Sequence, residues 1–375
     1  MNRTAAMNAL PAVDRVVPPL DLQRIARLPG LRALAWQSDT LYASRGYELV
    51  RAAFAANGSP PDRISWETVA RFRPSHWRRL TVRANLSARL FRDGIHALAL
   101  LPSGGMVAAV PGAIVSLGHG ETEFRITHAI TRGTRPLHIA SAPSGTLFWG
   151  EYFDNSARDE VHIYSSTDEG ASWTVGYTFP RGAIRHVHNI VYDRWADCLW
   201  VLTGDDGNEC RILRASCDLS HVDVLLQGNQ QTRAAALVPA QDGVYFSSDT
   251  PFEDNHIYHL DRLGKLSTLA PISASSIYGC QVGSHIFFST TVEPSEHNKD
   301  HRVRVYGGSC TDGWHSILDW KKDRWPMRFF QYGNAFLPDG DNRTPYLAVS
   351  TTAVESDDLV TSLYAVGSSA GPQGS

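Results

Sequence analysis

The sequence lacks a long apolar run, a large net charge and a regular set of cysteines. No stretch approaches the roughly 18 apolar residues that a membrane-spanning helix needs, so a membrane protein is not expected. The 35 basic residues are balanced by 38 acidic ones, and a formal charge of −3 offers no positive field for nucleic acid. The five cysteines are odd in number and have no CxxC spacing, so the sequence indicates neither a complete disulfide framework nor a zinc ribbon.

The ends of the chain are also poor in structural signals. Residues 1–20 contain no apolar segment of the kind found in secretion signals, and together with the cysteine count this predicts a cytoplasmic protein. We expect residues 1–19 to form a loose N-terminal arm and residues 367–375, rich in glycine and serine, to form a disordered tail. The intervening segment, 20–366, has a length that a single β-propeller or barrel can reach.

Short apolar runs alternate with clusters of glycine, asparagine, aspartate and proline, and helical periodicity is nearly absent. This pattern is typical of many short strands joined by tight turns. The runs recur with a period of about 40–50 residues, which indicates a propeller. The first strands of the repeats lie near Leu31, Ile95, Leu137, Val187, Arg233, Ile277 and Gln331. We therefore predict an all-β protein forming a single β-propeller of seven four-stranded blades, with six blades as the alternative if the stretched first repeat is irregular.

A propeller also needs a seal between its first and last blades. The segment 22–28 has the composition of a strand, and the last repeat contains the apolar runs YLAVSTT and SLYAV. We expect the early strand to pair with this last blade and to close the ring.

A turn motif occupies residues 166–173, Ser-Thr-Asp-Glu-Gly-Ala-Ser-Trp, between the third and fourth strands of the third repeat. It fits the pattern S/T-x-D-x-G-x-x-W, in which the aspartate accepts hydrogen bonds from turn amides and the glycine tolerates a positive φ. Partial copies occur at Ser216–Asp218, at Asp261 with Gly264, and at Thr311–Trp314. The sequence thus resembles the BNR or Asp-box superfamily of sialidase-like β-propellers. The resemblance implies a propeller that acts on carbohydrate, with the Asp-box as a folding motif away from the site.

The ligand face of a propeller is built by the entries to the first strands and by the loops between second and third strands. Ionisable and aromatic residues recur at these positions. The candidate catalytic residues are His186, His188, Tyr332, Glu151, Asp205 and Asp249. The candidate substrate-binding residues are Arg45, Arg185, Arg233, His138, Tyr278 and Glu293. His96, Arg135 and Tyr152 occupy the same kinds of position without an assigned role. The four carboxylates among the candidates are expected to converge around the channel mouth.

These residue types suit the chemistry of acidic sugars. A pair of carboxyl groups supplies the acid and the base or nucleophile of glycoside hydrolysis. His186 and His188 share a strand face, and three roles remain open for them: a divalent-metal pair, acid–base chemistry or structural hydrogen bonding. The arginines would clamp a carboxylate or pair with neighbouring loop acids. The tyrosines would act as nucleophile, proton donor or stacking platform, or lie in the core. No cofactor other than a metal at the histidine pair is indicated.

The combination predicts a carbohydrate-active propeller that processes an acidic glycan or sugar conjugate by glycoside hydrolysis or β-elimination at the channel mouth. The Arg-Ile-Pro motif that sialidases of the superfamily carry in the first blade is absent here. Two alternatives stay open: a non-catalytic propeller that binds glycans or proteins, and an intracellular enzyme of sugar or secondary-metabolite assembly. The expected partner is a carbohydrate or other small molecule, with no nucleic acid and no membrane, and the oligomeric state is left open.

Overall fold

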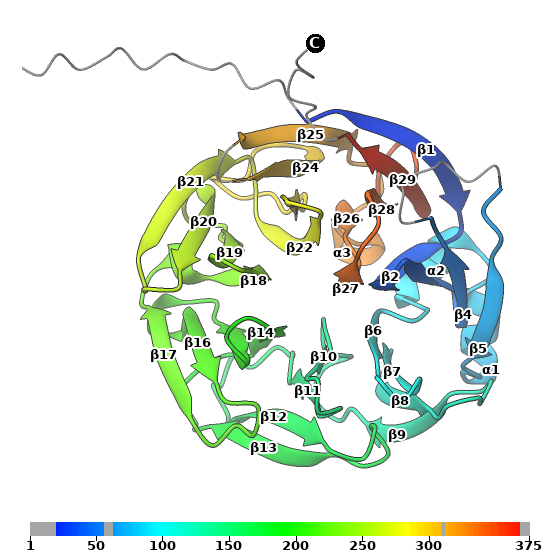
Figure 1. Ribbon diagram of the computed structural model, residues 1–375, viewed down its shortest axis with the longest axis horizontal. Helices are drawn as coiled ribbons and strands as arrows, with labels where there is room; N and C mark the ends of the chain where they lie inside the picture. The colour runs from blue at the N-terminus through cyan, green and yellow to red at the C-terminus, as the bar shows by residue number, and fades with distance from the viewer. Residues whose placement is uncertain (1–19, 56–62, 310–311, 368–375) are drawn as a thin grey trace, which may run out of the picture.

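The chain folds into a ring of small β-sheets whose first strands face a common axis (Figure 1). The computed structural model describes residues 20–55, 63–309 and 312–367. Within these ranges there are seven sheets, so the predicted all-β propeller of seven blades is confirmed and the six-bladed alternative is excluded. The predicted arm, 1–19, and all but the first residue of the predicted tail lie outside the described residues.

The strands follow one another from the axis outward in blades 1 to 4. Blade 1 contains β2 (Arg32–Ser38), β3 (Thr40–Arg45), β4 (Glu48–Ala53) and β5 (Glu67–Arg71). Blade 2 contains β6 (Ala97–Leu100), β7 (Met106–Val110), β8 (Ala113–Leu117) and β9 (Arg125–Ala129). Blade 3 contains β10 (Ala140–Ser141), β11 (Leu147–Gly150), β12 (Val161–Ser166) and β13 (Thr174–Phe179). Blade 4 contains β14 (Val187–Asp193), β15 (Cys198–Thr203), β16 (Arg211–Ala215) and β17 (Val222–Gln227).

Blades 5 and 6 repeat this order, and blade 7 departs from it. Blade 5 contains β18 (Ala234–Ala240), β19 (Gly243–Ser248), β20 (Asn255–Asp261) and β21 (Leu266–Ile272). Blade 6 contains β22 (Ser276–Val282), β23 (His285–Thr290), β24 (Arg302–Ser309) and β25 (Gly313–Lys321). Blade 7 contains β26 (Asn334–Phe336), β28 (Tyr346–Thr352), β29 (Val360–Val366) and, outermost, β1 (Leu22–Pro29). All seven first strands begin within three residues of the predicted positions.

The two ends of the described chain close the ring. Strand β1 pairs antiparallel with β29, in a register that joins Leu22 to Val366 and Pro29 to Val360, which confirms the predicted seal. A second link was not predicted. Strand β27 (Asp339–Asn342) leaves blade 7 and pairs parallel with β2, so that Ala35 lies opposite Asp339 and blade 1 gains a fifth strand near the axis.

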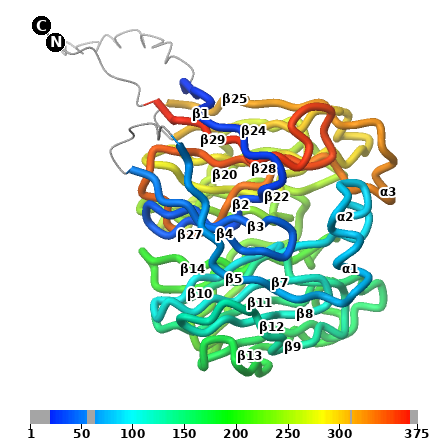
Figure 2. The backbone as a smooth tube through the Cα atoms, turned by 90° about the vertical axis from the view of Figure 1, so that its right-hand side faces the viewer, coloured from blue at the N-terminus to red at the C-terminus, as the bar shows by residue number. Residues whose placement is uncertain are grey.

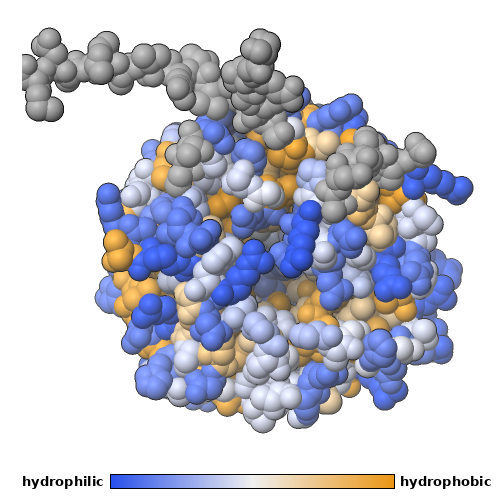
Figure 3. Space-filling view, in the orientation of Figure 1, coloured by the Kyte–Doolittle hydropathy of each residue, from blue (hydrophilic) through white to orange (hydrophobic). Residues whose placement is uncertain are grey.

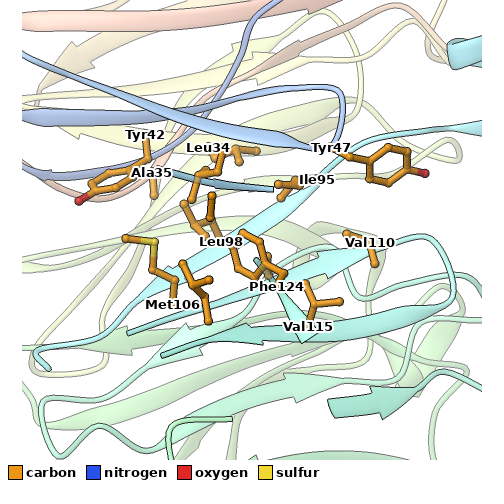
Figure 4. Packing of buried hydrophobic residues seen from close by; sticks show 14 of the residues in the cluster. Leu34, Ala35, Tyr42, Tyr47, Ile95, Leu98, Met106, Val110, Val115 and Phe124 are labelled. Atoms are coloured by element: carbon orange, nitrogen blue, oxygen red, sulfur yellow. The ribbon is translucent and has the colours of Figure 1, made fainter. Parts of the chain in front are cut away.

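Neighbouring blades pack face to face. Figure 4 shows the contact between blades 1 and 2, where Leu34 lies opposite Leu98 and Tyr42 lies opposite Met106. Strand β7, with the sequence MVAAV, is buried along its whole length. Because both faces of a blade are covered by neighbours, its inner strands are apolar throughout and do not alternate. This is why the repeats are visible in the sequence as short apolar runs.

Three short helices were not expected from the sequence. Helices α1 (His76–Thr81) and α2 (Asn85–Phe91) lie between blades 1 and 2 and account for the stretched first repeat, and α3 (Met327–Phe330) precedes blade 7. All three lie on the same face of the ring (Figure 2). They have only four to seven residues each, too few to show a helical period. No helix of the described residues is long and apolar enough to cross a membrane.

Arg89 anchors α2 to the last blade. Its side chain is fully buried, and Nη1 lies 2.7 Å from Asp323 Oδ2 and 3.1 Å from Asp358 Oδ2. Nη2 donates to the carbonyl oxygen of Phe330 at 2.6 Å. A buried arginine needs such partners because an unpaired charge in the interior is strongly destabilising. The pairs therefore hold the helical insertion over blade 7.

The turn at residues 166–173 has the hydrogen bonds that its sequence predicts. Asp168 Oδ1 accepts from Ser166 Oγ at 2.7 Å and from the amide of Ser172 at 2.9 Å. Trp173 Nε1 donates to Thr127 Oγ1 of the neighbouring blade at 3.3 Å. The motif thus fixes the hairpin of blade 3 and also joins it to blade 2.

Two of the partial copies form similar turns. The carboxylate of Asp218 accepts from the amide of Ser220 at 3.0 Å, and that of Asp261 accepts from the amide of Leu263 at 2.9 Å. In the third copy, residue 311 lies outside the described part of the chain.

We predict that Gly170→Ala destabilises the protein more than Gly145→Ala. Both glycines have positive φ, +80° and +85°, so alanine costs about 1–2 kcal/mol at either position. A Cβ on Gly170 would also lie 2.5 Å from Val107 Cγ2, whereas none of the described atoms lies within 4 Å of one on Gly145. Overpacking adds about 1–3 kcal/mol at Gly170. Urea unfolding of the two variants measures the difference, and equal losses would contradict the close packing of the turn against blade 2.

Candidate functional site

Seven of the twelve candidate residues form one connected cluster where the first strands of blades 4 and 5 begin. The members are Arg185, His186, His188, Asp205, Arg233, Asp249 and Glu293. They come from the entries to β14 and β18 and from the loops after β15, β19 and β23. Because the blades are arranged radially, these segments meet near the axis although they are far apart in the sequence.

Asp205 is the centre of this cluster. Its Oδ1 atom lies 3.1 Å from Arg233 Nη2 and 3.3 Å from His188 Nε2. Its Oδ2 atom lies 3.3 Å from Arg185 Nη1 and 3.6 Å from His186 Nε2. Burial by itself would raise the pKa of Asp205, but the hydrogen bond and charge of His188, with the charge of Arg233, outweigh it and hold that pKa below its usual range. Asp205 is therefore an ionised carboxylate.

The two histidines face each other with defined tautomers. Nδ1 of His186 lies 3.0 Å from the carbonyl oxygen of Phe153, and Nδ1 of His188 lies 2.9 Å from that of Ala234. A carbonyl oxygen only accepts, so both Nδ1 atoms carry the hydrogen. The two Nε2 atoms lie 3.0 Å apart. Burial, and then the charge of His188, lowers the pKa of His186 to about 4, which leaves its Nε2 without a proton at neutral pH.

Three further groups complete the acidic side of the channel. Burial raises the pKa of Asp249, whose Oδ2 lies 4.0 Å from Arg233 Nε, and burial followed by the charge of Asp249 raises the pKa of Glu293. Tyr152 packs on His186 with ring centroids 4.4 Å apart. Burial, with the charges of Asp249 and Asp205, raises the pKa of Tyr152 to about 12. This tyrosine therefore remains a neutral hydroxyl between the acids.

Two candidates do not join the cluster. Glu151 was expected in the carboxylate ring, but its Oε1 accepts from Arg132 Nε at 2.9 Å and its Oε2 accepts from the amide of His162 at 2.9 Å. These bonds extend the edge of blade 3 and direct the carboxylate away from Asp205. Arg45 was expected beside the other arginines, but its side chain is exposed and lies 3.3 Å from Glu48.

The other three candidates lie around the channel in other blades. His138 Nδ1 is 2.9 Å from Asp339 Oδ2 on β27, and the rings of His138 and Tyr278 are 5.9 Å apart. Tyr332 is 39% exposed beside α3, and its pKa is raised by burial and then by the charge of Glu293. These residues border the candidate site, and in the described part of the chain none of them forms an ion pair or hydrogen bond with Asp205.

A group of cationic side chains lies on the other side of the channel. Arg32 donates from Nη1 to His96 Nδ1 at 2.9 Å, and its guanidinium lies 3.8 Å from the ring centroid of Phe336. Among the described residues, Arg135 has no carboxylate within ion-pair distance, and its Nε is buried without a hydrogen bond. Burial, and then the charge of Arg32, lowers the pKa of Arg135 to about 10. Burial also lowers the pKa of Arg32.

A large cavity continues from this cationic side. It has a volume of about 1090 Å³ and lies between blades 1, 2 and 7, below α1 and α2. Its arginines are Arg32, Arg45, Arg71, Arg73, Arg79, Arg83, Arg89 and Arg92, whereas its acids are Glu48, Asp93 and Glu123. Within the described part of the chain, four of these arginines have no carboxylate partner: Arg32, Arg79, Arg83 and Arg92. The cavity therefore carries an uncompensated positive charge.

Polar residues alone do not distinguish the helical face of the ring, which is the face that carries α1, α2 and α3. Figure 3 shows the opposite face of the ring, away from α1, α2 and α3, and hydrophilic residues surround its centre as well. The distinguishing feature of the helical face is that buried histidines and acids lie on one side of the channel, whereas the half-buried Arg32 and Arg135 and the exposed Arg79, Arg83 and Arg92 lie on the other. His96, Arg135 and Tyr152 lie at first-strand entries or a loop after a second strand, the positions that identified the other candidates, but nothing local to Arg32 indicated a site.

Comparison with known proteins supports the fold. No protein-family model matches the chain, and no curated protein matches it. A chain from the crystal structure of the mitotic checkpoint complex superposes with a TM-score of 0.53 at 11% identity, over 98% of this chain and 100% of that chain. The WD40 β-propeller domain of Doa1 superposes with a TM-score of 0.54 at 11% identity, over 92% of this chain and 97% of that chain. The likeness is one of fold alone.

We predict that His96 makes the protein less stable at acid pH. Burial, with the charges of Arg135 and Arg32, lowers the pKa of His96 well below its ordinary value. As the pH falls below about 6.5, this histidine becomes protonated in the unfolded chain but stays neutral in the folded protein. The free energy of unfolding therefore falls by up to about 1.4 kcal/mol per pH unit. In His96→Gln, the fall in unfolding free energy between about pH 7 and pH 5 should be smaller by about 2 kcal/mol.

Chemical denaturation at the two pH values measures this difference. The matched control is His119→Gln, because His119 is an exposed histidine outside the site. If wild type and His96→Gln lose the same free energy on acidification, His96 is not buried neutral beside the arginines.

Proposed function

We propose that this protein is a binding propeller that recognises an acidic saccharide in the arginine-lined cavity of its helical face. The observation that carries the proposal is the set of cavity-lining arginines that have no carboxylate partner within the described chain, Arg32, Arg79, Arg83 and Arg92. A cavity of about 1090 Å³ is large enough for an oligosaccharide fragment.

The electrostatics of the neighbouring channel support an anionic ligand. The pKa of Arg135 is lowered to about 10 by burial and by the charge of Arg32, which means that two positive groups repel each other in a desolvated place. A carboxylate bound between them would relieve this repulsion and form charge-assisted hydrogen bonds. Guanidinium groups suit carboxylates because their paired donors match the two oxygens.

Two weaker observations favour a sugar as the carrier of the negative charge. The Asp-box turn of blade 3 supports a relationship with sialidase-like propellers, many of which act on carbohydrate. Phe72 and Phe336 also line the cavity and offer aromatic faces for a sugar ring. The WD40 propellers that share the fold support a binding role over a catalytic one, since propellers serve widely as recognition platforms.

Calorimetric titration with oligogalacturonate and with a neutral oligosaccharide of equal length tests the proposal. We expect binding of the acidic ligand only, with an affinity that falls as salt is added because exposed charges are screened. Equal binding of both sugars, or binding of neither, would reject an acidic saccharide as the ligand.

The unpaired arginines should carry this affinity. We predict that Arg83→Gln and Arg92→Gln each weaken oligogalacturonate binding by about tenfold, the equivalent of about 1.4 kcal/mol per lost charge-assisted contact. The control is Arg194→Gln, which removes an exposed arginine paired with Asp341 at the opposite end of β14. If the control weakens binding as much as the two cavity variants, the cavity is not the binding site.

Catalysis in the same channel is the second candidate function. The observation that favours it is the convergence of Asp205, Asp249 and Glu293 with two histidines, since acid and base groups are what hydrolysis or β-elimination requires. Incubation with polygalacturonate separates the two reactions: β-elimination produces an unsaturated, ultraviolet-absorbing end, and hydrolysis produces a new reducing end without it. An unchanged polymer, with binding intact, leaves the protein as a binding module.

A further inference from the structure

The histidine pair presents an electrostatic problem. Both Nδ1 hydrogens are used by backbone carbonyls, so the Nε2 atoms of His186 and His188 are the ring nitrogens that face each other, and they lie 3.0 Å apart. The oxygens of Asp205 lie 3.6 Å and 3.3 Å from the same two atoms. Asp205 already pairs with Arg185 and Arg233, but two buried ring nitrogens this close together also need a positive partner between them, either a proton or a metal ion.

We propose that His186 Nε2, His188 Nε2 and a carboxylate oxygen of Asp205 bind one divalent transition-metal ion, with Zn²⁺ as the reference ion. The site is independent of the saccharide-binding role of the arginine-lined cavity. Of the three roles that the sequence left open for the histidines, the proposal takes the divalent-metal pair.

The geometry fits a coordination shell. The donor atoms of the three residues all lie within 4.8 Å of one another. In a tetrahedral zinc site with Zn–N bonds of about 2.0–2.1 Å, adjacent ligand atoms are about 3.4 Å apart. The two ring nitrogens are 3.0 Å apart, and each has one oxygen of Asp205 nearby, Oδ1 at 3.3 Å from His188 and Oδ2 at 3.6 Å from His186. The side chains therefore need little movement to receive an ion.

The surrounding hydrogen bonds are those of a prepared metal ligand. A metal-binding histidine normally donates its second ring N–H to a backbone carbonyl or a carboxylate, which fixes the ring and leaves the other nitrogen free to coordinate. Phe153 and Ala234 supply these two carbonyl oxygens. Their positions are set by the loop after β11 and by the first residue of β18, so the rings are held by the ladders of blades 3 and 5.

The local charge also favours a cation. Arg185 and Arg233 contribute two positive charges around Asp205, and they are opposed by four carboxyl groups. Those groups are Asp154, Asp205, Asp249 and Glu293. With all four ionised, the balance is two minus four, or −2, which one divalent ion neutralises.

Three protein donors leave at least one coordination position open. Structural zinc sites are normally closed by four protein ligands, whereas sites that bind water or substrate keep a vacant position. The open position here would face the channel that Tyr152 and Asp249 border. The inferred site is accordingly of the ligand-binding type.

Titration of the metal-stripped full-length protein with Zn²⁺, without saccharide, tests the proposal. We expect one ion per chain. His188→Asn and His186→Asn keep a side-chain donor for the backbone carbonyl but remove the Nε2 ligand, so each should weaken Zn²⁺ binding by more than about a hundredfold, the upper effect of losing only an outer partner. His162→Asn is the control, since His162 is one imidazole beside one carboxylate, 3.6 Å from Glu160.

The outcomes are distinct. Equal affinity in wild type and in His188→Asn, or an equal loss in His162→Asn, would overturn the site. If the two histidine variants fail to fold by circular dichroism, Co²⁺ added to the wild type decides: ligand-field absorption bands of a nitrogen- and oxygen-coordinated ion support the site, and the spectrum of the free aquo ion refutes it. Because no saccharide is present, either result leaves the saccharide proposal to its own titration.

Discussion

The antiparallel pairing of β1 with β29 is the contact on which the rest of the structure depends. Every blade buries both faces against its neighbours, so no blade has a complete core by itself. The pairing joins Leu22 to Val366 and brings the first described residues into the last blade. Side chains reinforce the joint: Thr361 Oγ1 donates to the carbonyl oxygen of Leu31 at 2.7 Å, and Ser350 Oγ accepts from the amide of Ala33 at 2.8 Å. Only a closed ring brings loops of separate blades to one axis, and both halves of the candidate site are made of such loops.

The sequence was sufficient for the repeat and for the seal, because both depend on apolar runs of fixed spacing. It was insufficient where a partner distant in sequence decides the direction of a side chain. Glu151 follows the second strand of its blade, as Asp205 and Asp249 follow theirs, yet Arg132 and the amide of His162 hold it at the blade edge. The short helices could not be predicted for a related reason. Helix α2 has no periodic apolar face, and the ion pairs of Arg89 hold it against blade 7.

The positive charge on the arginine side of the channel could not be predicted from the composition. A formal charge of −3 describes a nearly neutral protein and gives no indication of a positive surface. Folding separates the charges: eight arginines and three acids line one cavity, while Asp205, Asp249 and Glu293 gather across the axis. Nothing in the local sequence distinguishes Arg32 from Arg51, which also lies on a strand of blade 1. Arg51 pairs with Glu67 at 2.9 Å on the outer side, whereas Arg32, on the first strand, faces the axis.

Gathering arginines on one side of the channel and acids on the other is by itself destabilising. Buried charges of like sign repel each other, and an unpaired guanidinium in a desolvated place is destabilising. On the arginine side, burial and the charge of Arg32 lower the pKa of Arg135 to about 10. On the acidic side, burial raises the pKa values of Asp249 and Glu293, so on both sides burial disfavours the charged form. Tyr152 lies in the electrostatic field of both sides, so the two groups belong to one channel. A propeller gains its stability from blade packing and does not need these charges. Their accumulation on one face is what the two proposed ligands would require, an anion at the arginines and a cation at the histidines.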